Sequence, residues 1–311
     1  AQASAFCSRP SASNGDSPLA RMLRTLSGGD DWGRPYGVAA DGDALYVSDE
    51  RRGVVRRVDA SGQAQDLAKG LRTPQGVAVA DGRVFVCEAA FGRVSAVDLE
   101  TGTLIPAWEG LKIPAGVDAQ ASTLWVASAG SHTILARDMR CREESWVVAG
   151  VPGCSGNMKN EQCGDGGSAT AARLFSPFDV AVAATGDVYI ADAYNGRVRM
   201  VSDGVIRTLA GADQSAPRGN RGEATKINIG QTRSVALSLG GPFVATSPSM
   251  IWQLRDDFME PYCGTFVEGY SGDEGNALDM RLSTPCGICC FGPSLVVADS
   301  DNKRVVLVDP A

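Results

Sequence analysis

The sequence predicts an all-β fold, a six-bladed β-propeller of four-stranded antiparallel blades that is closed by an N-terminal strand. Three observations predict it. A similar segment recurs six times, each copy has the pattern of successive β-strands, and an N-terminal segment matches the one strand that the sixth copy lacks. Length alone does not decide, because 311 residues fit either two domains or one large β domain.

The repeat emerges when six segments are aligned on the proline or threonine near the start of each one. A second position follows 14 residues later and is acidic in most copies, as in the pair Pro35 and Asp49. In the fourth copy Pro177 and Asp192 are 15 residues apart, and the extra residue falls in a turn. A register held through six copies indicates one structural unit for each copy. The copies span residues 34–59, 73–98, 113–138, 176–201, 231–254 and 284–309.

Each unit is predicted to contain four strands. The first is a short apolar run such as residues 76–80, GVAVA, which suits a strand buried on both faces. A Gly/Asp turn of the kind that forms tight hairpins leads to a second strand rich in aromatic and β-branched residues. A third strand alternates, as in residues 196–201, GRVRMV. A fourth, outer strand is predicted at residues 64–70, 145–150 and 205–211.

The two ends of the chain are predicted to meet in one blade. The sixth copy stops at residue 311 without a fourth strand, and residues 21–29, RMLRTLSGG, match residues 204–212, GVIRTLAGA. We therefore expect residues 21–29 to form the missing outer strand, which would leave no open edge in the ring. The prediction is a single domain over residues 17–311, preceded by a Ser-rich leader at residues 1–16.

The predicted blades resemble NHL repeats, and the fourth copy, residues 164–201, resembles the family pattern most. The third and fifth copies depart from it, because Ser128 and Thr246 stand where the acidic residue is expected. The resemblance covers almost the whole chain and implies the propeller fold. It does not imply one function, because propellers host unrelated activities.

The segment GDGGSATAARL, residues 164–174, could be a phosphate-binding loop or a connector between blades. It recurs without a gap at residues 219–229 and 272–282, each time shortly before an innermost strand. A phosphate loop would follow a strand, occur once for each site and open a longer helix. Glycines that turn the chain and an apolar residue that anchors it explain the three copies better, so connectors are predicted.

The long connectors, residues 151–175, 212–230 and 265–283, are predicted to share one face with the column of acidic residues, and this face is the predicted partner surface. An alternative for the acidic residues is that each one caps backbone N–H groups of its own turn. Arg93, Arg197 and Arg304 are expected to pair with them at the surface. The candidate binding residues are Asp165, Arg173, Arg221, Asp273 and Glu274 on the connectors, with Asp49, Glu88, Asp192 and Asp299 in the column.

Nine cysteines and a chain that begins with Ala rather than Met suggest a processed protein in an oxidising compartment, outside the cell or in an organelle lumen such as that of the thylakoid. Cys154 and Cys163 lie in one polar, Gly-rich segment and are the candidate disulfide pair. An odd number leaves at least one thiol free or paired between chains.

Charge and composition exclude some functions. A net charge of −7 argues against general binding of nucleic acid, and no apolar run approaches the roughly 18–20 residues of a membrane span, so no direct membrane insertion is expected. Cys286 and Cys289 form a CxxC without a second pair, and the lone histidine, His132, is expected to be a solvated turn residue. No metal or cofactor is predicted.

The predicted function is a non-catalytic scaffold for protein–protein interaction that binds a protein partner through the connector face. Six-bladed propellers of similar shape include calcium-dependent lactonases and esterases, and this likeness implies an alternative, a channel-centred metal-dependent hydrolase or lyase. Asp118 and Asp179 are the only acidic residues on the predicted inner strands, which is a thin basis for a calcium site.

Overall fold

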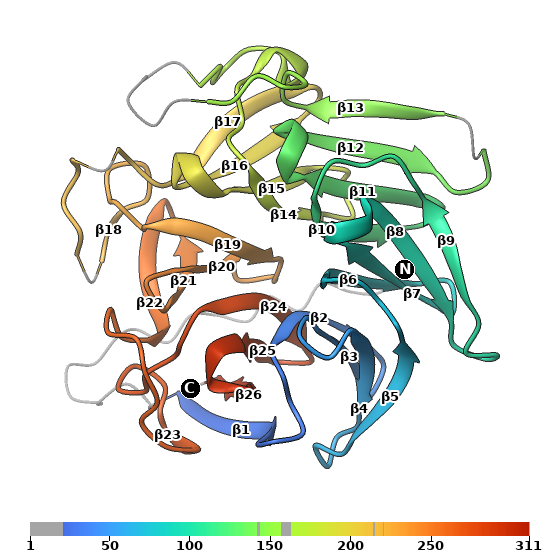
Figure 1. Ribbon diagram of the computed structural model, residues 1–311. Helices are drawn as coiled ribbons and strands as arrows, with labels where there is room; N and C mark the ends of the chain where they lie inside the picture. The colour runs from blue at the N-terminus through green and yellow to red at the C-terminus, as the bar shows by residue number, and fades with distance from the viewer. Residues whose placement is uncertain (1–20, 142–143, 157–162, 214, 220, 311) are drawn as a thin grey trace, which may run out of the picture.

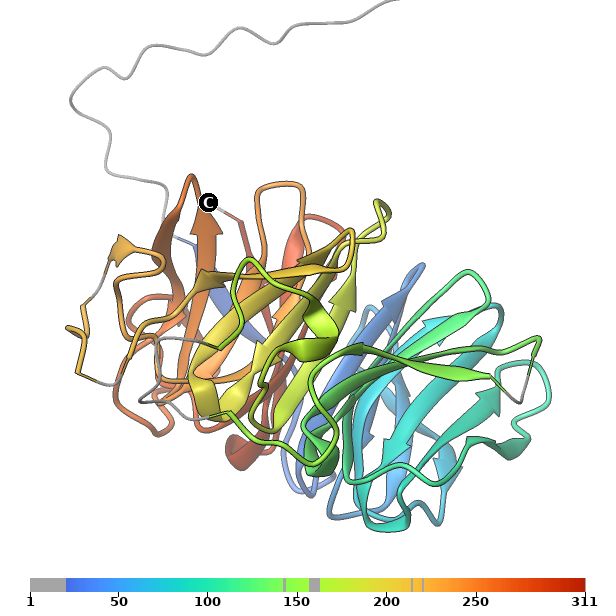
Figure 2. The same ribbon diagram turned by 90° about the horizontal axis from the view of Figure 1, so that it is seen from above.

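The computed structural model describes residues 21–141, 144–156, 163–213, 215–219 and 221–310. Six antiparallel sheets stand radially around a central axis, as the predicted propeller requires (Figure 1). Figure 2 shows the same ring from its edge. The predicted leader, residues 1–16, lies outside the described residues, so the domain boundary at residue 17 stays a prediction.

The first four blades each hold four strands in sequence order from the axis outward. This order confirms the predicted four-stranded units. The strands are β2 (Pro35–Asp41), β3 (Ala44–Asp49), β4 (Val54–Val58) and β5 (Ala64–Lys69) in blade 1; β6 (Pro74–Ala80), β7 (Arg83–Glu88), β8 (Arg93–Asp98) and β9 (Leu104–Trp108) in blade 2; β10 (Pro114–Gln120), β11 (Thr123–Ser128), β12 (Thr133–Asp138) and β13 (Ser145–Ala149) in blade 3; and β14 (Pro177–Val182), β15 (Val188–Asp192), β16 (Arg197–Ser202) and β17 (Val205–Ala210) in blade 4.

The last two blades carry a short fifth strand at their outer edge. Blade 5 contains β19 (Gln231–Ala236), β20 (Phe243–Ser247), β21 (Met250–Arg255), β22 (Phe258–Gly264) and the added β18 (Gly222–Glu223). Blade 6 contains β24 (Pro285–Phe291), β25 (Ser294–Asp299), β26 (Arg304–Asp309), β1 (Met22–Gly28) and the added β23 (Glu274–Asn276). Five single-turn 3₁₀ segments complete the described elements: η1 (Ala89–Phe91), η2 (Ala129–Ser131), η3 (Ala169–Ala171), η4 (Ala193–Asn195) and η5 (Ser300–Asn302).

The turn between the second and third strands ends on a left-handed residue. In blade 2 this residue is Gly92, with φ of 60°, and a Cβ there would overlap the carbonyl oxygen of Leu111. The Leu111 N–H in turn donates to the Gly92 carbonyl at 2.8 Å, so the turn packs directly on the connector to the next blade. His132 and Lys303 adopt the same conformation in blades 3 and 6, which is unfavourable for a residue with a Cβ.

The N-terminal strand closes the ring as predicted. β1 pairs antiparallel with β26, with Leu23 opposite Val308 and Arg24 opposite Leu307. The sheet therefore runs β23-β1-β26-β25-β24, and residues from both ends of the chain share one blade (Figure 1). The edge that β26 would otherwise present is covered by β1.

The copies of the GDGGSATAARL motif lie along the outer strand of the blade that follows each of them. β18 pairs with β22, and β23 pairs with β1. In blade 4 the Gly166 N–H donates to the Ile206 carbonyl at 2.8 Å, and the Ile206 N–H donates to the Gly167 carbonyl at 3.1 Å. The prediction that these segments are connectors is thereby confirmed, and each one also extends the edge of the next sheet.

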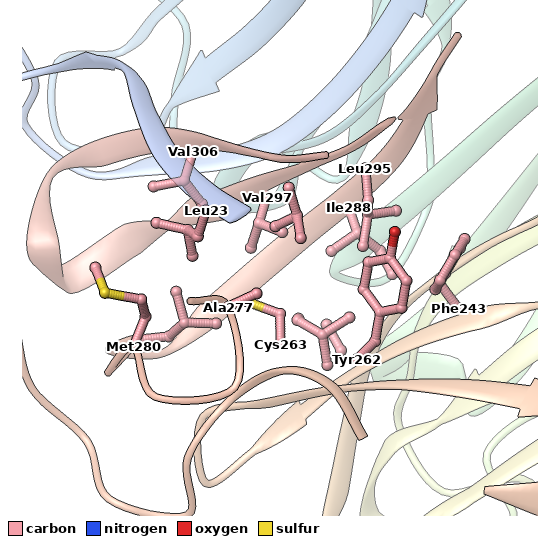
Figure 3. Packing of buried hydrophobic residues seen from close by; sticks show 14 of the residues in the cluster. Leu23, Phe243, Tyr262, Cys263, Ala277, Met280, Ile288, Leu295, Val297 and Val306 are labelled. Carbon is pink, nitrogen blue, oxygen red and sulfur yellow. The ribbon is translucent and has the colours of Figure 1, made fainter. Parts of the chain in front are cut away.

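The core consists of apolar clusters in the seams between blades. In the seam between blades 5 and 6, Leu23 of β1 is fully buried in one cluster with Cys263, Met280, Val297 and Val306 (Figure 3). The closing strand is thus held by side-chain packing as well as by its backbone ladder. Among the described residues, no helix is long and apolar enough to cross a membrane.

We predict that Leu23→Ala lowers the free energy of unfolding by about 2–5 kcal/mol, because it removes buried methyl groups and leaves a cavity at the point of ring closure. Urea denaturation followed by circular dichroism measures the change. Met22→Ala is the matched control, because the neighbouring Met22 side chain is 46% exposed. Equal losses for the two variants would contradict the role assigned to Leu23.

Candidate functional site

In four of the six blades, a carboxylate of the acidic column joins the end of the second strand to the backbone just before the inner strand. Asp49 accepts hydrogen bonds from the N–H groups of Gly33 at 2.7 Å and Arg34 at 2.9 Å. The corresponding bonds run from Arg72 N–H to Glu88, from Phe175 N–H to Asp192 and from Ser283 N–H to Asp299. All four carboxylates are fully buried. A partner cannot reach them in this conformation, and their observed role is to hold backbone N–H groups.

Two buried arginines connect this column to the connectors. Arg304, only 2% exposed, donates through Nε to Asp299 at 2.7 Å and lies 3.8 Å from Asp273. In blade 4, Arg199 pairs in the same way with Asp192 and Asp165. Asp165 and Asp273 are the second residues of two copies of the GDGGSATAARL motif. Each one therefore pairs with a guanidinium that also pairs with a carboxylate of the acidic column. Burial raises the pKa of Asp192 and of Asp299, and the arginines oppose that rise.

The predicted surface pairs between column acids and arginines need correction. Arg93 does pair with Glu88 at 2.7 Å, but the pair between Asp299 and Arg304 is buried rather than at the surface. Arg197 pairs instead with Asp213 at 3.1 Å, while Arg199 takes its place at Asp192. Arg197 and Arg199 are two positions apart on β16 and therefore lie on the same face of the sheet, and the connector supplies a second acidic residue, Asp213, for Arg197.

The connector candidates do not converge on one site. Asp165 and Arg173 are exposed near the start of blade 4, and Asp273 and Glu274 lie on the outer rim of blade 6. Arg221 is on the rim of blade 5, where it pairs with Glu260 at 2.8 Å. The motif copies that pair with an outer strand therefore lie at the outer edge of the ring. The last residues of each connector lead back to the inner strands at the central channel.

The predicted disulfide between Cys154 and Cys163 is not observed. The structure records no disulfide among the residues it describes; Cys154 is exposed, and Cys163 is buried with its Sγ 2.9 Å from Arg197 Nη1. The secreted or lumenal location that the cysteine content suggested stays a prediction.

At the axis, the inner strands approach each other backbone to backbone. A Cβ placed on Gly76 would lie 2.6 Å from the carbonyl oxygen of Ala115 and 2.7 Å from Cα of Gly116. The same position is glycine in blades 1 and 6, but blade 4 has Asp179 and blade 5 has Ser234. Two adjacent blades therefore place polar side chains where the other four leave bare backbone.

The two channel carboxylates are used by backbone donors. Asp179 Oδ2 accepts from Ser234 Oγ at 2.6 Å and from Val235 N–H at 3.1 Å, and Asp118 Oδ2 accepts from Val182 N–H at 2.7 Å. The remaining oxygen of each carboxylate accepts from the next residue in its own strand. Burial raises the pKa of Asp179 to about 7. Each carboxylate thus joins its blade to the next one.

The described residues contain no group of three His, Cys, Asp or Glu side chains that could hold a metal ion. Since the oxygens of Asp118 and Asp179 already accept N–H or O–H donors, these two residues do not fit an open calcium site, which needs six to eight oxygen ligands.

A cavity of about 300 Å³ occupies the channel. Its end at the connector side is lined by the residue that precedes the axial glycine position in five of the six blades: Tyr36, Ala115, Phe178, Arg233 and Cys286. These residues were not selected from the sequence. Their signal in the sequence was the variable position before the axial position, which is glycine in four of the six copies. This variable position is aromatic in two copies, Tyr36 and Phe178, and is an arginine, Arg233, in a third.

Aromatic side chains continue from this channel mouth onto the surface. The ring of Tyr194 lies 5.6 Å from that of Phe178 and 5.2 Å from that of Phe175, and Phe175 contacts His132 at 5.6 Å. His132 is half-buried, and its Nδ1 accepts a hydrogen bond from Ser176 N–H at 3.1 Å. The prediction of a solvated histidine is therefore wrong, because the start of blade 4 packs on the turn of blade 3.

Residues 50–237, which include most of this channel wall, match the family model of the teneurin NHL domain. The chain belongs to the teneurin NHL domain family. Among curated protein sequences none matches the chain significantly.

Solved structures show how widely this NHL propeller shares its fold. A protein of unknown function from Bacteroides thetaiotaomicron is 15% identical, with a TM-score of 0.74 over 93% of this chain and 76% of that one. A virginiamycin B lyase from Staphylococcus aureus is 12% identical, with a TM-score of 0.61 over 93% and 100% of the two chains. A gluconolactonase from Xanthomonas campestris is 13% identical, with a TM-score of 0.63 over 97% and 98%. At these identities the likeness shows the fold alone.

For this NHL propeller, Asp299→Ala is expected to lower the free energy of unfolding by about 3–5 kcal/mol, because Arg304 would keep a buried charge without its main partner. Thermal and urea denaturation provide the measurement. Asp273→Ala is the control, because that side chain is 70% exposed and contributes about 0–1 kcal/mol at most. A loss for Asp299→Ala no larger than for the control would refute the assignment.

The free energy of unfolding is expected to depend on pH because Asp179 titrates at a different pH in the folded and unfolded protein. Its pKa of about 7 in the folded protein exceeds the ordinary value of 3.8, so neutral Asp179 stabilises the fold fully below about pH 4, and this stabilisation is lost as the pH rises through about 7. Urea denaturation at several pH values should show the wild type losing stability relative to Asp179→Asn across this window.

Asp138→Asn is the contrasting variant for this titration. The hydrogen bond from Arg140 lowers the pKa of Asp138 from 3.8 to about 2, so its contribution to stability is complete above about pH 5 and constant from there to pH 7. A constant difference between wild type and Asp179→Asn over that range would disprove the expected titration.

Proposed function

We propose that this NHL propeller is a non-catalytic platform for protein–protein interaction, with its partner surface on the connector face around the channel mouth. One observation carries the proposal: neighbouring blades 2, 3 and 4 expose a large apolar side chain at that face. Phe91 is 56% exposed, Ile113 56% and Tyr194 41%. Exposed apolar groups that gather on one face are typical of interaction sites.

Arginine and aromatic side chains are interleaved on this surface. The guanidinium of Arg93 lies 4.8 Å from the centre of the Phe91 ring, that of Arg34 lies 5.6 Å from the Tyr36 ring, and that of Arg233 lies 5.4 Å from the Phe178 ring. Arginine, tyrosine and other aromatic residues are enriched in the centres of protein interfaces. Contact with an aromatic ring restrains each arginine side chain before binding, so less side-chain entropy is lost when a partner binds.

The metal-dependent hydrolase or lyase remains the alternative, since structures of similar fold include a lyase and a gluconolactonase. It has weaker support in this chain, because the oxygens of Asp118 and Asp179 accept donors from within the protein. The proposal includes a secreted or organelle-lumenal setting, which rests on the cysteine content.

The test is site-specific photo-crosslinking in the native extract. A photoreactive residue replaces Tyr194 or Ile113 on the proposed surface, and Leu239 serves as the control because it is fully exposed in the first turn of blade 5, at the opposite end of the channel. A discrete protein adduct is expected from positions 194 and 113 but not from 239. Adducts only from position 239, or none from 194 and 113, would contradict the proposal.

Once a partner is recovered, Tyr194→Ser is expected to weaken its binding by at least about tenfold, because truncating an aromatic anchor at an interface centre costs more than about 1 kcal/mol. Surface plasmon resonance provides the dissociation constant. Leu239→Ser, at the opposite end of the channel, should bind as the wild type does.

A further inference from the structure

The channel mouth contains a guanidinium without a counter-ion. Arg233 lines the cavity together with Tyr36 and Cys286. Arg34 lies beside them, with its guanidinium 5.6 Å from the centre of the Tyr36 ring and its Nη2 3.9 Å from Cys286 Sγ. Arg34 is neutralised, because it forms ion pairs with Glu50 and with Asp301 at 2.9 Å. Arg233 forms no ion pair with any described acidic residue.

The Arg233 side chain is half-buried, and its Nε is buried without a hydrogen-bond partner in the part of the chain that the structure describes. A buried guanidinium N–H that is left unpaired costs free energy, more so because the group is charged. Its guanidinium carbon lies 5.4 Å from the centre of the Phe178 ring, which keeps the group beside the cavity but gives its Nε–H no acceptor oxygen.

The other groups of the cavity complement an anion with an apolar body. Tyr36 brings a hydroxyl to the same mouth, and burial raises its pKa, so it is a neutral donor. The two carboxylates that line the cavity, Asp118 and Asp179, are both engaged by N–H or O–H donors of the inner strands. The remaining wall is mostly Gly, Ala and Val backbone and side chains.

We propose that the channel mouth is a binding site for a carboxylate group, held by the Arg233 guanidinium and the Tyr36 hydroxyl, with an apolar or aromatic substituent in the cavity. One uncompensated positive charge matches a monoanion, and the planar fork of arginine matches a carboxylate in two parallel hydrogen bonds. The cavity of about 300 Å³ is at the small end of ligand sites, which suits a ligand of the size of a benzoate or a single terminal residue.

The same chemistry is available from a free carboxylic acid or from the C-terminal carboxylate of a peptide. The site adjoins the surface of the proposed function but does not depend on it. Loss of carboxylate binding with intact crosslinks at position 194 would reject this inference alone, and the reverse result would reject the platform alone.

The test is titration of the full chain with benzoate and with its neutral isostere benzamide, followed by the NMR shifts of the backbone amides of residues 233–235. Benzoate is expected to shift these amides in the millimolar range, and benzamide is expected to leave them in place. No shift with benzoate, or equal shifts with the two probes, would overturn the proposal, because an apolar pocket would treat them alike.

The variants separate charge from geometry. Arg233→Gln is expected to weaken benzoate binding by at least about tenfold, and Arg233→Lys, which keeps the charge but loses the fork, by less. Arg57→Gln removes the same charge from an exposed position on β4 and should bind as the wild type does. If Arg57→Gln weakened benzoate binding as much as Arg233→Gln, general electrostatic attraction would replace the proposed site.

A second pair of probes distinguishes the sources. A tripeptide with C-terminal phenylalanine is compared with the same peptide carrying a C-terminal amide. Tighter binding than benzoate, lost on amidation, would assign the site to a peptide terminus. Binding of benzoate without binding of the tripeptide would assign it to a free carboxylic acid.

Discussion

The close approach of the inner strands around the axis is the constraint on which the rest of the structure depends. At Gly76 and its equivalents the backbone of one blade lies against the backbone of the next, with no room for a Cβ. This contact sets the width of the channel. A side chain at the axial glycine position therefore enters the channel and determines which groups line it. Asp179 and Ser234 occupy it in two adjacent blades, and they bond to each other and to the backbone of the following blade.

The outer part of each blade is organised around buried charge. The column carboxylates hold backbone N–H groups at the start of the inner strands, and in blades 4 and 6 an arginine joins the carboxylate to the connector. Removing one partner of such a pair is costly, whereas the complete pair adds little beyond its hydrophobic equivalent. These groups are best understood as devices that fix how each connector passes from one blade to the next.

The proposed partner surface and the proposed carboxylate site share the channel mouth, and both depend on residues that the repeat leaves free to vary. Phe178, Arg233 and Tyr36 occupy equivalent positions in three different blades. The fold does not require their side chains, because Ala115 stands at the same position in blade 3. Their chemistry is therefore available for recognition rather than for stability.

The sequence by itself determined the six-bladed architecture, the four strands of each unit and the closure by residues 21–29, because these follow from periodic patterns along the chain. It also identified the motif at residues 164–174 as a connector. Tertiary structure alone decided that the column carboxylates are buried, that Arg199 rather than Arg197 meets Asp192, and that His132 packs on the next blade. It also brought Tyr36, Phe178 and Arg233 together. The channel mouth is built from one residue of each of five blades, and these residues, about 50–80 positions apart in the chain, become neighbours only when the ring closes.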